Sequence, residues 1–371
     1  MNKRQMQLPA PQAGQALRVV IFTGRFGMGH CAAAEALRQE ILEERPACRV
    51  QVVDVMDYLF PELSGRIYDA FGFLVKRCSW VYNLLNRAVG TRLGAPLQKP
   101  VIKKLDALLE GADLLIATMP VCSQYLSAYK RQRNSRIPLY TYVTDVTVHE
   151  EWIAPETDLY FAASDETREA LAARGVGRDR IVVSGIPVRQ SFRRLPQGRR
   201  EGRHVLIMGG GLGLIPEADA LLEALGRDAS LHVTVIAGRN EALLRRVRER
   251  FPQVEAVGYT DRVEQYMGRA DLVITKSGGI TTFEAIYAQT PLYVLRPFLV
   301  QETGNARFIE RQGLGWVGWQ KDSGVAVNDV TALLRRPQLL EQMRRNMRQI
   351  RSRWAPTSPL RYLPAAAAHC G

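Results

Sequence analysis

Short runs of apolar, β-branched residues recur along this chain and alternate with segments of helical composition. In the first half these runs are RVVIFTG, VQVVDV, DLLIAT, LYTYVTD, LYFAAS and IVVSG; in the second half they are HVLIMGGG, HVTVIAG, VEAVGY, DLVITKSGG and PLYVLRP. Such alternation is typical of buried parallel strands joined by helical crossovers. The sequence therefore predicts an α/β protein with parallel sheets.

A polar, basic segment after Pro187, RRLPQGRREGRH, separates the two sets of strands. Its proline, glycines and charges indicate a linker, and 371 residues exceed the usual size of one domain. We therefore expect four parts: a flexible N-terminus (1–16), a first α/β domain (17–195), a second (196–338), and a C-terminal basic helix and tail (339–371).

The stretch TGRFGMGHCAAAEALRQEI follows the first predicted strand. In parallel sheets, ligands bind beyond the carboxyl ends of the strands, where helix N-termini offer unpaired N–H groups. Gly24, Gly27 and Gly29 would let the backbone approach a ligand there, and His30, at the start of the next helix, could act as a general base. The alternative is a tight turn with a structural histidine.

The second half has two similar glycine-rich turns. In MGGGLG, Gly209, Gly210, Gly211 and Gly213 could wrap a phosphate. In TKSGGITTFEA, Gly278 and Gly279 would leave N–H groups free for a diphosphate, while Glu284 could accept hydrogen bonds from two ribose hydroxyls. The alternative for Glu284 is a solvated helix face.

The polar segment QETGNA follows the run LRPF. Its Gln301, Glu302 and Asn305 lie on a predicted post-strand loop that leads into another helix. They could bind a ligand or simply cap that helix.

Five motifs in series resemble the diacylglycerol glycosyltransferases: GMGHCAAAEAL, VTDVTVHEEWIAPETDLYFAASDETREAL, VVSGIPVRQSF, TKSGGITTFEAI and QETGNARFIERQGLG. This family includes bacterial processive diacylglycerol glucosyltransferases and plant-type monogalactosyldiacylglycerol synthases. It is more distantly similar to the peptidoglycan GlcNAc transferase that acts on a lipid-linked sugar. The resemblance covers about positions 17 to 320. It implies a GT-B fold of two Rossmann-like domains facing across a cleft, and inverting transfer of a hexose from a UDP-sugar to a lipid hydroxyl, that of diacylglycerol.

The resemblance also implies roles for residues of the first domain. His30 matches the histidine of the glycine-rich acceptor loop, so Gly27 and Gly29 fall on the acceptor side. Asp145, His149 and Trp152 match the element V-T-D-x-x-x-H-x-x-W, also on the acceptor side. We take His30 as the first candidate for the catalytic base and Asp145 as the rival or orienting partner; His149 could be merely structural.

In the second domain the resemblance implies a donor site. Glu284, Gln301, Glu302 and Asn305 match residues that contact ribose and sugar. The full expected UDP-sugar set is Gly210, Gly211, Lys276, Gly278, Gly279, Thr281, Glu284, Gln301, Glu302 and Asn305. Two positions depart from the family pattern: Val300 replaces a glycine before the Gln-Glu pair, and Ser277 replaces the proline of a K-P-G-G turn.

No Asp-x-Asp metal motif occurs in the sequence. Helix N-termini, glycine-loop amides and basic side chains would then stabilise the departing diphosphate. We expect a metal-independent transferase without a cofactor, the UDP-sugar being a substrate.

The segment Ser64 to Gly90 mixes an apolar stripe with basic and aromatic residues. Such a segment suits the headgroup layer of an anionic membrane. The expected membrane contacts are Phe71, Phe73, Lys76, Arg77, Trp80 and Tyr82. The alternative is a core helix with a basic rim. The basic segment Leu339 to Trp354 could touch the membrane, pack on the first domain or be a solvated face.

The net charge of +13 favours an anionic partner: nucleic acid, a membrane or a polyanionic substrate. No nucleic-acid recognition motif occurs, whereas a phosphate-binding site plus a membrane accounts for the charge. Five cysteines without metal-ligand spacing favour a reducing compartment, and no apolar run has signal-peptide or membrane-span length. We expect a cytoplasmic protein, peripheral on the inner face of the membrane.

Three other functions share these features. The chain could transfer GlcNAc from UDP-GlcNAc to another lipid-linked acceptor, act as a nucleotide-sugar epimerase of the same fold, or be a UDP-sugar-binding regulatory protein. An epimerase would not need the amphipathic segment. A regulatory protein would not need His30, Asp145 and Glu284 together.

Overall fold

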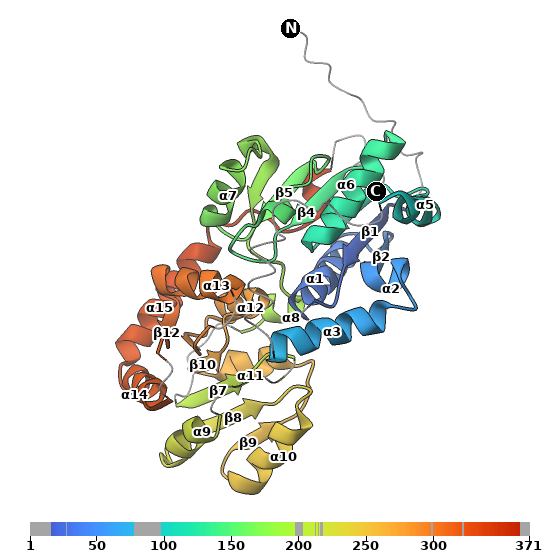
Figure 1. Cartoon of the computed structure of the whole chain (residues 1–371). Coiled ribbons are helices and arrows are strands. Elements are labelled where there is room, and N and C mark those ends of the chain that lie inside the picture. Colours follow the sequence, from blue (N-terminus) through green and yellow to red (C-terminus); the bar gives the residue numbers. More distant parts are fainter. Residues whose placement is uncertain are drawn as a thin grey trace. The chain divides into compact units, whose positions relative to one another are not determined.

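The structure is a computed structural model of the chain. It describes residues 16–26, 28–77, 98–196, 203–211, 213, 215, 218–297, 300–320 and 323–363, with the backbone alone at 71–77, 98–100, 300, 301, 323 and 325. The chain divides into two compact units (Figure 1). Unit 1 comprises Met1–Arg189 and Ala355–Gly371, and unit 2 comprises Gln190–Trp354.

Unit 1 is built on a six-stranded sheet of order β2-β1-β3-β4-β5-β6 in which every pairing is parallel. Its strands are β1 (Arg18–Thr23), β2 (Arg49–Asp54), β3 (Leu114–Ala117), β4 (Leu139–Tyr142), β5 (Leu159–Ala162) and β6 (Ile181–Val183). Its helices are α1 (Met28–Glu44), α2 (Val55–Leu59), α3 (Ser64–Arg77), α5 (Gln98–Leu109), α6 (Pro120–Arg133), α7 (Asp165–Ala172), and the 3-10 helices η1 (Glu150–Trp152), η2 (Arg178–Arg180) and η3 (Pro359–Tyr362). The strand order reverses between β1 and β3, which is where such sheets bind ligands.

The core of unit 1 lies on both faces of this sheet. Val20 and Phe22 of β1 pack with residues of α5 and α6, whereas Val19 and Ile21 pack with Leu37 and other residues of α1. Successive strand residues point to opposite faces, so a continuous apolar run is what a doubly covered sheet requires.

Unit 2 repeats this plan with a second six-stranded parallel sheet, of order β12-β11-β10-β7-β8-β9. Its strands are β7 (His204–Met208), β8 (His232–Ile236), β9 (Glu255–Val257), β10 (Leu272–Thr275), β11 (Leu292–Val294) and β12 (Gly315–Val317). Its helices are α8 (Gln190–Arg193), α9 (Ala218–Gly226), α10 (Glu241–Arg250), α11 (Val263–Arg269), α12 (Gly279–Ala288), α13 (Val300–Arg311), α14 (Ser323–Leu334) and α15 (Pro337–Arg351).

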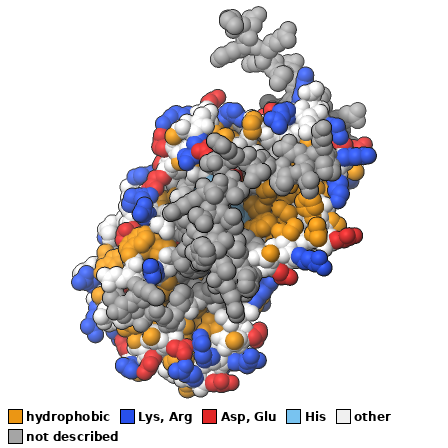
Figure 2. Space-filling model, in the orientation of Figure 1, with side chains coloured by type: hydrophobic (Ala, Val, Ile, Leu, Met, Phe, Trp, Pro, Cys, Tyr) orange, Lys and Arg blue, Asp and Glu red, His pale blue; other side chains and the backbone are white. Residues whose placement is uncertain are grey.

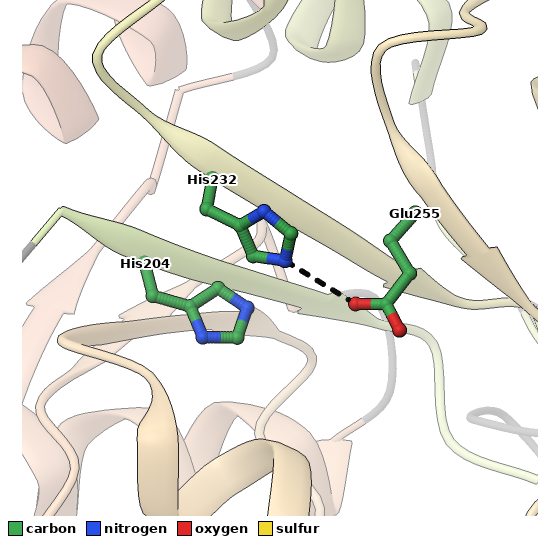
Figure 3. A group of neighbouring side chains, drawn as sticks. All are labelled: His204, His232 and Glu255. Carbon is green, nitrogen blue, oxygen red and sulfur yellow. Dashed lines mark hydrogen bonds and ion pairs between the residues drawn. The ribbon is translucent and has the colours of Figure 1, made fainter.

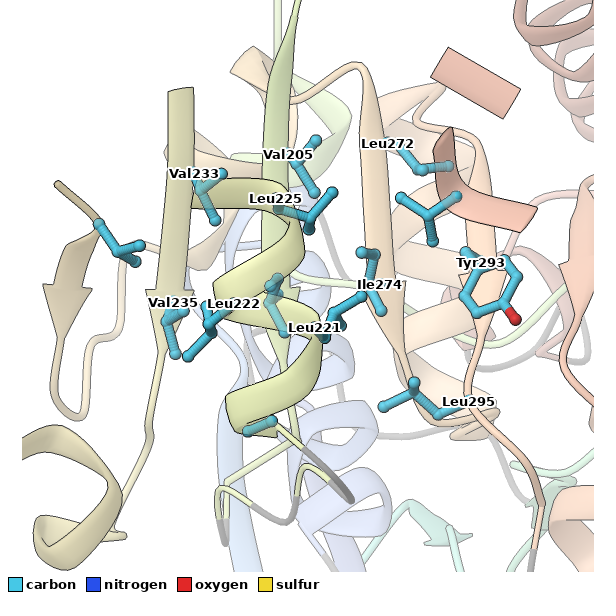
Figure 4. Close-up of a cluster of buried hydrophobic side chains, with 14 of the residues drawn as sticks. Val205, Leu221, Leu222, Leu225, Val233, Val235, Leu272, Ile274, Tyr293 and Leu295 are labelled. Atoms are coloured by element: carbon cyan, nitrogen blue, oxygen red, sulfur yellow. The ribbon is translucent and has the colours of Figure 1, made fainter. Parts of the chain in front are cut away.

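One face of the unit 2 sheet is covered by α9. Leu221, Leu222 and Leu225 of this helix pack on Val205 and Val235 of neighbouring strands (Figure 4). The prediction of two Rossmann-like α/β halves with parallel sheets is confirmed.

The last two segments of the chain belong to different units. Helix α15 contacts α12 and α14 of unit 2, and two of its arginines form ion pairs: Arg344 with Asp271, and Arg348 with Glu341. The residues after it return to unit 1, where Thr357 donates a buried hydrogen bond to Glu40 of α1 at 2.7 Å. The segment 339–371, expected as one basic helix and tail, is thus shared between the two units.

None of the helices in the described ranges is long and apolar enough to cross a membrane.

Candidate active site

His30 lies in the first turn of α1, directly after β1. The loop before it passes close to the start of α6, because a Cβ atom on Gly24 would lie 3.2 Å from the Met119 side chain. Gly27 lies outside the described residues, and Gly29 is the second residue of the helix. The β1–α1 junction thus places the His30 ring at the carboxyl edge of the sheet, beside the residues that follow β3 and β4.

The Nδ1 atom of His30 lies 3.0 Å from the backbone oxygen of Thr118 and 2.7 Å from Oγ1 of Thr144. A carbonyl oxygen can only accept, and Thr144 Oγ1 donates its own proton to the same carbonyl at 3.2 Å. Nδ1 must therefore carry the hydrogen in this arrangement. This assignment leaves the Nε2 lone pair available to take a proton from a substrate.

The His30 ring is neutral near neutral pH. Burial lowers its pKa, and this effect outweighs the opposite ones of the Asp145 charge and the hydrogen bond to Thr118. A neutral ring with a fixed tautomer has the properties of a general base.

The other expected acceptor-side residues follow β4. Asp145 is half-buried and close enough for its charge to act on His30. His149, also half-buried, immediately precedes η1. Trp152 is fully buried and packs with Val143 and other core residues. Any effect of Trp152 on an acceptor therefore acts through the position of its loop, not through direct contact.

Sequence reasoning missed both partners of His30. Thr118 follows β3 and Thr144 follows β4, and Thr118 also donates from Oγ1 to the backbone oxygen of His30 at 3.2 Å. The available signal was position: each threonine lies within two residues of the end of a buried strand, β3 or β4, and β3 is one of the two strands between which the strand order reverses.

A second network ties α3 to the loop before His30. Tyr68 of α3 donates to Asp54 at 2.6 Å and accepts from the Arg25 backbone N–H at 3.0 Å. The Arg25 guanidinium lies 4.7 Å from the centre of the Tyr68 ring and forms ion pairs with Asp54 and Asp57. Tyr68 therefore anchors the start of the predicted membrane segment to this loop.

The structure follows the predicted membrane segment only in part. It confirms a helix to Arg77 but does not describe the side chains of Phe71, Phe73, Lys76 and Arg77; Trp80 and Tyr82 lie outside the described residues.

In unit 2, three expected donor-side residues, Lys276, Glu302 and Asn305, meet with Ser277 where β10 ends and α13 begins. Lys276 Nζ lies 3.3 Å from Glu302 Oε1, whose side chain is only 5% exposed. Ser277 donates from Oγ to the backbone oxygen of Glu302 at 2.7 Å, and Asn305 Nδ2 donates to the backbone oxygen of Ser277 at 3.0 Å. These bonds join the loop before α12 to the first turns of α13. The Gln301 side chain is not described.

The glycine loop after β7 packs against the loop after β8. Gly210 and Gly238 both have positive φ angles, of 69° and 58°. A Cβ atom on Gly238 would lie 2.8 Å from the Gly211 oxygen and 2.9 Å from the Gly210 oxygen, so no larger residue fits there. A Cβ on Gly210 would lie 3.4 Å from the Lys276 side chain, which places the β7 loop beside the β10 loop.

Helix α12 begins at Gly279, with Gly278 as its N-cap. The expectation of a free Gly278 amide is wrong, because this N–H donates to the Lys276 oxygen at 2.8 Å. The N–H groups of the next turn, from Gly279 to Thr281, have no intrahelical acceptor, as in the first turn of any α-helix. Glu284 is only 7% exposed, which excludes the alternative of a solvated helix face.

The comparisons with known proteins agree with this architecture. Residues 30–188 match the family model of monogalactosyldiacylglycerol (MGDG) synthase, and residues 204–354 match that of the glycosyltransferase family 28 C-terminal domain. A processive diacylglycerol beta-glucosyltransferase of Bacillus cereus is 28% identical over 384 aligned positions, which cover 95% of this chain and 92% of the relative.

Two solved structures show the fold. MurG of Acinetobacter baumannii has a TM-score of 0.59 at 16% identity, covering 92% of this chain and 96% of its own. UDP-GlcNAc 2-epimerase from Neisseria meningitidis, bound to UDP-GlcNAc, has a TM-score of 0.53 at 14% identity, covering 88% and 94%. The fold alone therefore does not separate transferase from epimerase.

Two Rossmann-like units of this kind define the GT-B fold. The glycosyltransferase class comes from the match of the second unit to the family 28 model. The two family models and the relative are more specific than the fold. They confirm the resemblance to the diacylglycerol glycosyltransferases that the motifs carry.

Proposed function

We propose that this protein is an inverting glycosyltransferase that moves a hexose from a UDP-sugar to the hydroxyl of diacylglycerol at a membrane surface. The observation that carries the proposal is the geometry of the His30 ring, which Thr118 and Thr144 hold through Nδ1 at the edge where the strand order of unit 1 reverses. The rest of the chain supports it, since its similarity to a processive diacylglycerol beta-glucosyltransferase extends over 95% of its length.

On the acceptor side, His30 acts as the base. Nε2 takes the hydroxyl proton as the acceptor oxygen attacks the anomeric carbon. The bond from that carbon to the diphosphate breaks on the opposite face, so the configuration inverts. Asp145 stabilises the imidazolium that forms, because its charge favours the protonated ring. Thr144 and Thr118 hold the tautomer that makes Nε2 the proton acceptor.

On the donor side, negative charge grows on the leaving diphosphate. The first-turn amides of α12 and the cation of Lys276 stabilise it, and Glu284 binds the ribose hydroxyls. Glu302, which forms an ion pair with Lys276, and Asn305 contact the sugar together with Gln301. We propose that this electrostatic set performs transfer without a metal or other cofactor.

The lipid end of the acceptor lies on unit 1. Met28, at the start of α1, is 40% exposed, and Leu63, just before α3, is 50% exposed. Figure 2 shows hydrophobic side chains gathered on the part of the surface where α1 and α2 lie in Figure 1. We propose that this area and α3, with Phe71, Phe73, Lys76 and Arg77, contact an anionic membrane from its cytoplasmic side. Trp80 and Tyr82 continue the same segment.

The direct test is product formation. Purified protein is incubated with diacylglycerol liposomes and each of UDP-glucose, UDP-galactose and UDP-GlcNAc, and the lipids are separated by thin-layer chromatography. We expect a glycosyl-diacylglycerol from at least one hexose donor, with equal yield in the presence of a chelator. Three other outcomes would contradict the proposal. Transfer only to a polyprenyl-linked acceptor would indicate a transferase for that lipid, and epimerised UDP-GlcNAc without a lipid product would indicate an epimerase. UDP binding without turnover would indicate a regulatory protein.

A further inference from the structure

A cluster of metal-ligating side chains lies in unit 2 at the opposite edge of the sheet from the donor loops. It consists of His204, His232 and Glu255, the first residues of β7, β8 and β9. We propose that these three residues form a binding site for a divalent transition-metal ion of the Zn²⁺ type. The site is independent of the proposed transfer reaction.

The register of the sheet brings the three side chains together. His204 pairs with His232 across β7 and β8, and Thr234 pairs with Glu255 across β8 and β9. Paired residues, and residues two apart on one strand, share a face of the sheet. Figure 3 accordingly shows the two rings and the carboxylate converging on one face, and one ligand atom from each lies within 4.8 Å of the others.

The donor set and its spacing suit Zn²⁺. Two imidazoles and one carboxylate are a common set for this ion, with a fourth position left to water. In a tetrahedral site with bonds of about 2.0–2.1 Å, neighbouring ligand atoms lie about 3.3–3.4 Å apart. His232 Nε2 and Glu255 Oε2 already lie 3.3 Å apart. Rotation of the His204 ring toward them would complete three ligands.

The surroundings support the same assignment. Thr234 Oγ1 lies 2.8 Å from His204 Nε2 and donates to Glu255 Oε2 at 2.7 Å, so it can serve as an outer partner that orients the ligands. His204 is 9% exposed, whereas the side chains of His232 and Glu255 are 62% and 39% exposed. The cluster therefore has a buried inner ligand and an open outer side through which an ion can enter.

The ion would not take part in sugar transfer. The strands β7 and β8 have five residues each, so the two edges of the sheet are about 13 Å apart along the strands. The glycine loop and Lys276 follow the carboxyl ends of the strands, whereas the three residues of the cluster lie at the amino ends. Its effect is expected on the stability of unit 2, because an ion that binds only the folded state stabilises it.

The test uses the full chain without an affinity tag, treated with chelator and dialysed. Co²⁺ is titrated in while the visible absorption of tetrahedral Co²⁺ is recorded, and Zn²⁺ is then added as competitor. We expect one saturating equivalent, displacement by Zn²⁺, and a rise in melting temperature with Zn²⁺. His232→Gln and Glu255→Gln should each weaken binding at least ~10-fold, as losses around metal sites commonly do.

Glu249→Gln is the matched control, because Glu249 is an exposed glutamate on α10 in the same unit; it should bind as the unchanged chain does. Circular dichroism and UDP binding establish that each variant is folded. No saturable binding by the unchanged chain would overturn the proposal. So would equal binding by His232→Gln, Glu255→Gln and the control, because the ion would then lie elsewhere.

Discussion

Unit 1 and unit 2 both gather loops at the carboxyl edge of a parallel sheet, but the groups in those loops differ in chemistry. In unit 1 the loops after β1, β3 and β4 converge on one titratable ring, that of His30, which two threonine oxygens fix. In unit 2 the loops after β7, β8 and β10 converge on glycines, a helix N-terminus and a lysine–carboxylate pair. In the proposed function, the fold sets where ligands bind, and the residues after each strand set whether the edge moves a proton or holds an anion.

The largest effect on this comparison is expected from removal of the His30 ring. His30→Ala should reduce transfer by about 10²- to 10⁴-fold, the usual contribution of a general base. UDP affinity, measured by calorimetry, should not change, because the donor groups lie in unit 2. A variant with full turnover would remove His30 from the mechanism. A parallel loss of UDP affinity would show that the two edges are not separate in function.

The converse variant acts on unit 2. Glu284→Gln keeps the size of the side chain but removes the charge that strengthens hydrogen bonds to ribose. Such bonds contribute about 1.5–3 kcal/mol, so UDP affinity should fall about 10- to 100-fold. Glu223→Gln, on the exposed face of α9, serves as control. Unchanged UDP affinity in Glu284→Gln would assign this buried carboxylate a structural role.

The sequence predicts some features of both sheet edges. The strands were visible as apolar runs because both faces of each sheet are covered. The turns were visible because glycine is favoured where φ is positive, as at Gly210. His30 was visible because it follows such a turn. These features are local, and local patterns report them.

What sequence could not predict depends on register and packing between distant segments. Thr118 and Thr144 reach His30 across 88 and 114 residues, and their position after a strand does not tell which side chain they contact. Trp152 occurs in a motif, yet only the packed structure shows that its ring is a core residue. His204, His232 and Glu255 have no metal-ligand spacing in sequence, because three parallel strands that begin at one edge bring them together.

A third variant examines how unit 1 fixes its ring. Thr144→Val removes the Oγ1 that lies 2.7 Å from His30 Nδ1, while Thr118 still accepts from Nδ1. One neutral hydrogen bond contributes about 1 kcal/mol, so kcat should fall about 5- to 10-fold, with the KM for UDP-sugar unchanged. Thr144→Ser should restore most of the activity. A fall in melting temperature without a change in kcat would indicate that Thr144 only packs.

The pH profile separates His30 from its rival Asp145. Burial holds the pKa of His30 below its usual value of 6.5, and the base acts only when neutral. Transfer should therefore persist as pH falls to 6.5 and be lost at lower pH, where the ring gains a proton. Asp145→Asn removes a charge that raises this pKa, so the acid limb of kcat/KM should move to lower pH. Complete loss of transfer in Asp145→Asn would instead favour Asp145 as the base.

The smallest expected effect tests the bond that joins the two donor loops of unit 2. Ser277 replaces the proline usual in the family turn and donates from a fully buried Oγ to the Glu302 oxygen at 2.7 Å. That oxygen lies within α13, and in an α-helix a backbone oxygen also accepts from the N–H group four residues later. Ser277→Ala therefore leaves no unpaired acceptor and should cost about 1 kcal/mol in the free energy of unfolding, measured by urea titration. UDP affinity should fall slightly and the pH profile set by unit 1 should stay unchanged. A shifted profile would mean that the two edges are coupled, because Ser277 bonds to Glu302 and Asn305 of unit 2.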